Sequence, residues 1–390
     1  MAFTGKATYS AFAAELAVDV SPLISLRAPI VTPVLDLIGD ATNPITAQST
    51  EHTWRDDEYA PAFTVIASVG VNSATAATYI QVNGEAGHMQ VGDVWQLGTV
   101  NLSTGREHVQ IDSIVGGGGS SSANTIHVTR GAFGTSQTSI TAGTSLIFIA
   151  NASLEGESQR PDISRVRVAI KNYVQPIVKP VEVALSMEAV EKYNQIGSEF
   201  EFQARRRIDE GLRDLENAVL RGTSTETIGN GTTYRTMKGL WNWITNTHTI
   251  TTAAFNTDFI DDAIESGWLL GHYQGYNLMI VGGTAQKLLD RLPEVTKITS
   301  QDERYITRVV RTYESGLTGG PMRIVVTPNM DPRAFIITHT ECLAVVPLQE
   351  RSFQFFKYAL TGQSQKGELV GEYTVEVRQP VTMIRGYITV

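Results

Sequence analysis

The chain has 390 residues, and at about 150 residues per domain this length predicts two to three domains. Hydrophobic residues make up 42% of the chain, which is enough for a packed core and excludes wholesale disorder. The formal net charge of −9 argues against a dedicated nucleic-acid-binding protein, because such proteins carry a clustered basic surplus. Cys342 is the single cysteine, so an intramolecular disulfide and a cysteine-based zinc site are excluded.

The first 50 residues form a segment that is apolar but repeatedly interrupted by proline. Proline removes a backbone donor and clashes with the preceding turn, so a long helix is excluded here. An extended segment rich in leucine, isoleucine and valine needs a surface on which to lie. That surface is either the chain's own core or a neighbouring molecule, and the sequence leaves both open. We treat residues 1–50 as an N-terminal arm.

Residues 64–151 are rich in glycine, serine, threonine and β-branched residues and hold few charges. Short apolar runs alternate there with turn sequences such as Asn83-Gly84, a pattern that predicts a small all-β domain, either a barrel or a sandwich. The predicted strands are 79–82, 94–97, 109–115, 126–128 and 146–149. A tryptophan in a strand usually belongs to the core, so a carbohydrate-binding role for Trp95 is only an alternative.

Residues 186–221 are the one long stretch with a helical pattern. Apolar side chains recur there at intervals of three and four residues, which predicts one apolar face. Ser186 is the predicted N-cap and Gly222 the predicted stop. At about 1.5 Å per residue such a helix would be about 54 Å long, more than one compact domain needs.

The other side of this helix is charged. Its spacing predicts the ion pairs Glu201–Arg205 and Arg206–Glu210 on a solvated face. The alternative is that this face contacts another subunit. In that case, replacing Arg205, Arg206 and Arg207 by glutamate would impair assembly more than folding, because exposed ion pairs contribute only about 0–1 kcal/mol to stability.

From residue 257 onward, helical and strand patterns alternate, which predicts an α+β module. We expect helices near residue 260 and over 285–292, and strands over 278–281, 322–327, 334–338 and 342–346. Apolar and polar residues then alternate from Tyr373 to Arg378, and the strand pattern resumes from Val381 to Val390. We therefore expect the C-terminus to be held in a sheet.

No motif for catalysis, a cofactor or a metal is complete. Gly362-Gln-Ser-Gln-Lys366 resembles a nucleophile elbow, but lysine stands where the second glycine is required. The seven histidines are far apart, and His339 and Cys342 would point to opposite faces of a strand. We expect no enzyme, no cofactor and no metal site. We also expect no secretion signal and no membrane span, since no long apolar run is present.

Several distinct sequence motifs follow one another along the whole chain. They are Ser21-Pro22, Thr32-Pro33, Ile38-Gly39, Glu51-His-Thr-Trp54-Arg-Asp-Asp57, Val128-Thr-Arg130-Gly-Ala-Phe-Gly134, Leu154-Glu-Gly156, Leu360-Thr-Gly-Gln-Ser-Gln-Lys366 and Glu372-Tyr-Thr-Val-Glu-Val377. With the arm, the β-rich insert and the long charged helix, they resemble the major capsid proteins of tailed bacteriophages, in the subgroup with an inserted β-domain. The family's usual Gly-Asp-Ser reads Gly362-Gln363-Ser364 here.

The resemblance implies an α+β chain with the Hong Kong 97-type fold and an inserted all-β barrel or sandwich domain. The implied parts are an N-terminal arm (1–50), an extended loop with connecting strands (51–63 and 152–185), the inserted β-domain (64–151), a peripheral domain (186–256 and 346–390) with a spine helix (186–221), and an axial domain (257–345).

The resemblance also implies a function in the virion. Copies of the chain would form pentamers and hexamers of an icosahedral shell that encloses double-stranded DNA without sequence-specific binding. Scaffold, portal and decoration proteins are possible partners, and synthesis would take place in the host cytoplasm. The candidate subunit-interface residues are Arg205, Arg206, Arg207, Glu199, Glu201, Trp54, Arg55 and Asp57. The alternative is another virion component, such as a tail-tube or surface-binding decoration protein.

Overall fold

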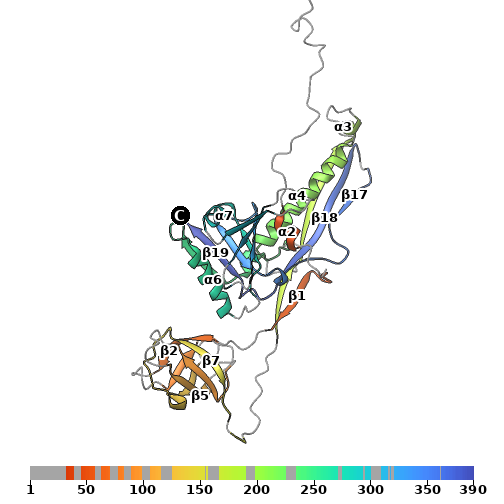
Figure 1. Ribbon diagram of the computed structural model, residues 1–390. Coiled ribbons are helices and arrows are strands. Elements are labelled where there is room, and N and C mark those ends of the chain that lie inside the picture. The colour runs from red at the N-terminus through yellow and green to blue at the C-terminus, as the bar shows by residue number, and fades with distance from the viewer. Residues whose placement is uncertain are drawn as a thin grey trace, which may run out of the picture.

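In the computed structural model the chain folds into an inserted β-barrel, two further sheets with their helices, and a two-stranded ribbon (Figure 1). The described residues are 32–38, 45–57, 63–70, 78–82, 89–98, 106–115, 125–153, 155–156, 167–189, 198–224, 234–270, 275–292, 295–299, 309–314, 317, 320–360 and 362–390. Residues 1–31 and 39–44 of the expected arm lie outside them.

The inserted region is a closed β-barrel, which Figure 1 shows as a body apart from the rest of the chain. Its interior is filled by inward-pointing apolar side chains, since successive side chains of a strand point to opposite faces. Strands are present at all the positions expected from the sequence, and β2 is an additional one. In pairing order the strands are β2 (Phe63–Gly70), β3 (Tyr79–Val82), β6 (Thr125–Thr129), β5 (His108–Val115), β4 (Asp93–Leu97) and β7 (Ser145–Asn151).

A seven-stranded mixed sheet forms the centre of the second body. Two of its neighbouring pairs are parallel, β10 with β19 and β11 with β14, and the others are antiparallel. The central strands are buried on both faces, which explains their unbroken apolar sequences. In spatial order the strands are β10 (Asn246–Thr251), β19 (Ile384–Thr389), β15 (Ala334–Thr338), β11 (Leu278–Val281), β14 (Met322–Val326), β13 (Val309–Tyr313) and β12 (Val295–Thr299).

Different helices cover the two faces of this sheet. Leu278 and Ile280 of β11 join a buried cluster with the long helix α4 (Glu199–Arg221). The alternate residues Met279 and Val281 join a second cluster with α6 (Thr257–Leu269) and α7 (Gly283–Leu289). Because successive strand residues point to opposite faces, α4 lies on one face of the sheet, and α6 and α7 lie on the other.

The third body is built around the long strand β18 (Ser364–Val377). One edge of β18 pairs with β9 (Gln175–Ala184), and the other pairs with β17 (Gln354–Lys357) and then β16 (Leu343–Pro347). The helix α4 packs along β9 and β18, and Gly211 permits this approach because a Cβ there would press against Leu369 and Phe353. The result is the elongated projection of helix on strands at the upper right of Figure 1.

The remaining elements connect these bodies. The strands β1 (Glu51–Asp56) and β8 (Val168–Tyr173) pair as an antiparallel ribbon, from which the chain enters and leaves the inserted barrel. The short helices are α2 (Pro33–Ile38), α3 (Leu185–Ala189), α5 (Leu240–Trp243), η3 (Ala132–Gly134) and η4 (Thr340–Cys342). A long helix on β-strands beside a mixed sheet, with a closed β-barrel inserted, is the α+β arrangement with an inserted β-domain expected from the sequence.

The structure corrects the expected start of the long helix. It begins at Glu199 and not at Ser186, because the backbone of Ser198 is extended (φ −114°, ψ 123°) and Ser186 belongs to the short helix α3. Residues 190–197 lie outside the described part of the chain. The N-cap is Ser198, whose hydroxyl accepts a hydrogen bond from Glu201 N at 3.3 Å. Ser198 followed by Glu201 has the capping-box spacing, a stronger start signal than a lone serine.

Two strands from the ranges expected to be peripheral join the seven-stranded sheet. Strands β10 and β19 fall within the ranges expected to be peripheral (186–256 and 346–390), but both pair in the seven-stranded sheet. Likewise, the strand expected over 342–346 begins one residue later, after η4. Periodicity identifies a strand but does not identify its neighbour.

Gly386 of β19 lies opposite Phe335 of β15, and a Cβ at this position would overlap the aromatic ring. We expect Gly386→Ala to lower the free energy of unfolding by about 1–3 kcal/mol, the usual cost of overpacking a core. The control is Gly283→Ala in the first turn of α7, where a Cβ meets no atom within 4 Å. Urea denaturation of both variants checks this, and equal midpoints would contradict it.

Candidate assembly surfaces

The solvent-facing side of α4 is rich in arginine. Arg205 and Arg206 are exposed, and no ion pair or hydrogen bond holds their side chains among the described residues. The expected ion pairs with Glu201 and Glu210 are therefore wrong. Glu210 pairs instead with Arg207, three residues away, whose side chain is partly buried. Arg213 and Arg221 are also exposed on this helix. The same helix has two exposed acidic residues, Glu201 and Asp209.

Two of the candidate interface residues on α4 have partners within the chain. Arg207 is held by Glu210, as described above. Glu199 is half-buried, and its carboxylate accepts a hydrogen bond from Gln203 Nε2 at 2.7 Å. Of the α4 candidates, Arg205, Arg206 and Glu201 are thus the ones that the fold leaves exposed to a partner.

The structure also corrects the interface role expected of Trp54. The indole is 8% exposed and packs edge-on against Trp243 of α5, with ring centroids 5.6 Å apart. It belongs to the chain's own core, because removing the apolar surface of a large ring from water stabilises the fold. Arg55 is exposed, and Asp57 forms an ion pair with Arg167 (Oδ2 to Nε 3.1 Å) in which both side chains are largely exposed.

The ribbon is fastened to β18 through a buried carboxylate. Glu376 Oε2 lies 2.8 Å from His52 Nε2, and Glu376 Oε1 accepts a hydrogen bond from Arg378 Nε at 2.6 Å. Burial raises the pKa of Glu376, but the hydrogen bonds from His52 and Arg378 outweigh burial and leave the pKa below its ordinary value. Asn172 of β8 adds a second link, because its amide Nδ2 donates to the carbonyls of Lys238 and Val375. The base of the insertion is therefore fixed to the main body.

A second buried carboxylate joins three segments of the chain. Glu216 of α4 is fully buried, and Oε2 accepts hydrogen bonds from Val34 N and Leu35 N, in the first turn of α2. Its other oxygen, Oε1, accepts from Thr327 Oγ1 at 2.7 Å and Asn329 Nδ2 at 2.9 Å, just after β14. Residues 33–38 of the expected arm thus pack on the chain's own core, where Val34 and Ile38 are buried.

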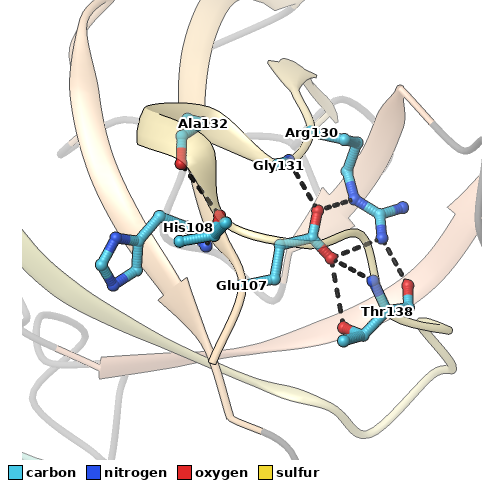
Figure 2. Close-up of polar contacts among 7 residues, drawn as sticks. Glu107, His108, Arg130, Gly131, Ala132 and Thr138 are labelled. Carbon is cyan, nitrogen blue, oxygen red and sulfur yellow. Dashed lines mark hydrogen bonds and ion pairs between the residues drawn. The ribbon is translucent and has the colours of Figure 1, made fainter. Parts of the chain in front are cut away.

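The barrel holds a buried ion pair, shown in Figure 2. Glu107 Oε1 lies 2.6 Å from Arg130 Nε, and Glu107 Oε2 lies 2.7 Å from Arg130 Nη2. The same carboxylate accepts hydrogen bonds from Gly131 N and Thr138 N, so it secures the loop between β6 and β7. Burial raises the pKa of Glu107, but the bonds from Arg130, Thr138 and Gly131 together bring it below its ordinary value.

Sequence reasoning missed the buried carboxylates of Glu216 and Glu107, although each had a signal. Glu216 is an acid between Leu215 and Val219, which lie on the apolar face of the helix. Glu107 and Arg130 are two of the few charges in a charge-poor region, and a charge that a fold buries needs a partner. In each case an acid among apolar residues indicated a buried carboxylate that binds other segments of the chain.

The described residues contain no group of three or more histidine, cysteine or acidic side chains that could hold a metal ion. Cys342 is buried, and burial raises its pKa to about 11, so its sulfur is a neutral thiol near pH 7. None of the helices described combines the length and the apolar character required to span a membrane. Trp95 lies in the barrel core.

Solved structures of viral and encapsulin shells are similar to this chain in outline. The cyanophage A-1(L) capsid protein has 10% sequence identity and a TM-score of 0.49, with 98% of this chain and 99% of that chain covered. A structure from Mycobacterium phage Bobi has 8% identity and a TM-score of 0.48, with 98% and 99% covered. The SrpI encapsulin of Synechococcus elongatus has 8% identity and a TM-score of 0.42, with 57% and 77% covered.

The sequence comparison identifies the family. No curated protein matches the chain significantly. Residues 3–386, however, match the family described as SU10 major capsid protein, so the match spans the arm, the inserted barrel, the long helix and the C-terminal strands. The order of elements inferred from the residues is thus that of a phage head protein, and the chain belongs to the SU10 major capsid protein family.

Proposed function

We propose that copies of this capsid protein assemble into pentamers and hexamers, which close into an icosahedral shell around double-stranded phage DNA. The observation that carries the proposal is the thin projection of α4 on β9, β17 and β18 (Figure 1). Its outer part has a small core, formed by Val181, Val183 and Phe200 with Phe355. So small a core supports little structure alone, and contacts between copies would complete it.

The end of the projection supports this proposal. Leu185 N donates to Gln363 O and Tyr358 N donates to Lys366 O, so the ends of β9, β17 and β18 lie together there. Large apolar side chains are exposed at this end, namely Leu185, Met187, Phe356, Tyr358 and Leu360. A cluster of exposed apolar side chains marks a surface for association. Repeated contact between different patches of identical copies produces closed rings and shells.

The domain assignment that goes with this proposal follows the sequence, with the boundaries adjusted. Strands β10 and β19 join the axial domain, and the spine helix is α4. The extended loop comprises 51–63 and 152–185, the inserted domain 64–151 and the arm 1–50. The proposed subunit contacts use Arg205, Arg206, Glu201, Arg55 and Asp57, which are the candidates that the fold leaves at the surface.

The proposal includes the surroundings of the shell. The chain acts without catalytic activity or cofactor, is made in the host cytoplasm, and reaches the virion with scaffold, portal and decoration proteins as further partners. The net charge of −9 supports DNA enclosure without sequence-specific binding, because counterions can neutralise the phosphates.

Expression of the full chain, followed by sedimentation and negative-stain electron microscopy, tests the proposal. We expect capsomers, and closed shells under conditions that promote assembly. A monomer of 42.5 kDa under every assembly condition, or tubes in place of shells, would contradict it.

A further inference from the structure

Helix α6 presents a row of acidic side chains to solvent. Asp258, Asp262 and Glu265 are exposed and follow one another at intervals of four and three residues, so they lie on one side of the helix. The helix carries no lysine or arginine. No ion pair neutralises these three carboxylates among the described residues; Asp258 accepts one hydrogen bond, from Asn256 Nδ2 at 3.2 Å. We call Asp258, Asp262 and Glu265 the acidic row.

The surface of α4 has the opposite charge. Arg205, Arg206 and Arg213 are exposed; the first two have no partner in the described part of the chain, and Arg213 meets only its neighbour Asp214, at 3.5 Å. Asp209 lies among them and reduces the local net charge. Arginine binds carboxylates with two parallel hydrogen bonds, so this arginine face suits a carboxylate-bearing partner. We call Arg205, Arg206 and Arg213 the arginine face.

The two surfaces match in spacing and point in opposite directions. Asp258 and Glu265 are seven residues apart, as are Arg206 and Arg213, which is a distance of about 10.5 Å along each helix. Because α4 and α6 cover opposite faces of the seven-stranded sheet, their solvent-facing sides are turned away from each other. The acidic row of one molecule therefore cannot reach its own arginine face.

We propose that the acidic row of one subunit binds the arginine face of the next subunit around the ring. This inference rests on the proposed assembly into pentamers and hexamers and names one of the contacts within them. Complementary patches on opposite sides of a subunit produce a head-to-tail contact, which closes into a ring when the rotation fits. The occupant is a second copy, because the chain itself carries the complementary charges in the matching spacing.

Charge reversal and charge exchange test this contact. One variant replaces all three acids of the row by lysine (D258K, D262K and E265K), and a second replaces all three arginines of the face by glutamate (R205E, R206E and R213E). We expect each to lower the yield of capsomers and shells about tenfold or more, because like charges at an interface oppose association. The variant that combines both sets restores opposite charges, and we expect its yield to return to within about threefold of the unmodified chain.

A matched control reverses charge elsewhere on the same side of the sheet as α6. Lys287 and Arg291 are exposed in and just after α7, and we expect K287E with R291E to leave the yield unchanged. Thermal unfolding of every variant separates assembly from folding. Should R213E disturb folding, R205E with R206E alone replaces the arginine variant.

The outcomes separate this inference from the proposed function. Shells from the unmodified chain, with no loss in either reversed variant or no recovery in the combined one, would overturn the contact and leave the shell proposal standing. Absence of any assembly by the unmodified chain would overturn the shell proposal itself. Normal shells that lose DNA only in the arginine variant would assign the arginine face to phosphate contacts and would also overturn the inference.

Discussion

Replacing Glu216 by alanine is expected to lower the free energy of unfolding of the subunit by about 3–5 kcal/mol. The side chain is fully buried and accepts four hydrogen bonds, from Val34 N, Leu35 N, Thr327 Oγ1 and Asn329 Nδ2. Each buried donor that loses its acceptor costs about 1–3 kcal/mol, and water that enters the vacated space recovers part of the loss. Helix α2 is then expected to detach first, because its first turn loses two acceptor contacts at once.

Urea denaturation of unassembled subunits measures this effect, and limited proteolysis within residues 33–38 reports the release of α2. Asp209→Ala, on the exposed side in the middle of the same helix, is the control and is expected to change stability by less than about 0.5 kcal/mol. Glu216→Gln should fall between the two, since it keeps one acceptor oxygen and places a donor against the other partners. An alanine variant as stable as the control would show that Glu216 does not join these segments.

Replacing Glu107 by alanine is expected to destabilise the barrel by about 3–5 kcal/mol, because Arg130 is then left as a buried charge without its partner. The loss should be confined to the barrel, whose core is separate from the clusters of the two other sheets. Differential scanning calorimetry would show the barrel transition moving to lower temperature while the other transitions stay in place. The double variant E107L with R130M should recover part of the loss, since it leaves no unpaired charge. A uniform shift of all transitions would contradict the local role.

The same pair makes barrel stability depend on pH in a defined direction. The pKa of Glu107 in the folded chain lies below the ordinary value of 4.5, so the folded state binds a proton less readily than the unfolded state does. The contribution of this carboxylate is therefore fully present above about pH 4.5 and is lost as the pH falls through the lower folded pKa. Barrel unfolding followed at pH 7 and at pH 3 should show this loss in the parent chain. A barrel that lacks Glu107 should show a smaller pH dependence.

Local patterns predicted the strands of the barrel except β2, and most of those in the seven-stranded sheet, because alternation and apolar runs are properties of a few neighbouring residues. The partners of those strands could not be predicted in the same way. Strand β19 pairs with β15 and β10, and β10 lies more than a hundred residues away in the chain. The predicted start of α4 at Ser186 was wrong, because Ser186 lies in the short helix α3 and α4 begins at Glu199. The correct start had a signal in the sequence, namely the capping-box residues Ser198 and Glu201.

The candidate assembly surface was predicted in part. Charge alternation indicated the exposed side of α4, but it could not show that Arg207 pairs with Glu210 while Arg206 has no partner in the described residues. Trp54 lies in a strand with charged neighbours, and only the fold places Trp243 beside it. The acidic row on α6 is visible in the sequence, but its significance depends on α4 and α6 lying on opposite faces of one sheet, which is a property of the tertiary structure.

The ribbon at the root of the barrel gives the subunit a site for exchanging whole modules. Asp56 and Val168 lie opposite each other in the antiparallel ladder, so their Cα atoms are about 5 Å apart. A two-residue Asn-Gly turn closes such a gap, and any compact module with adjacent termini can replace the turn. We therefore expect that this chain can lose, acquire or exchange a whole module at this position while the strands β1 and β8 stay paired, and that the same position can carry a displayed antigen or enzyme.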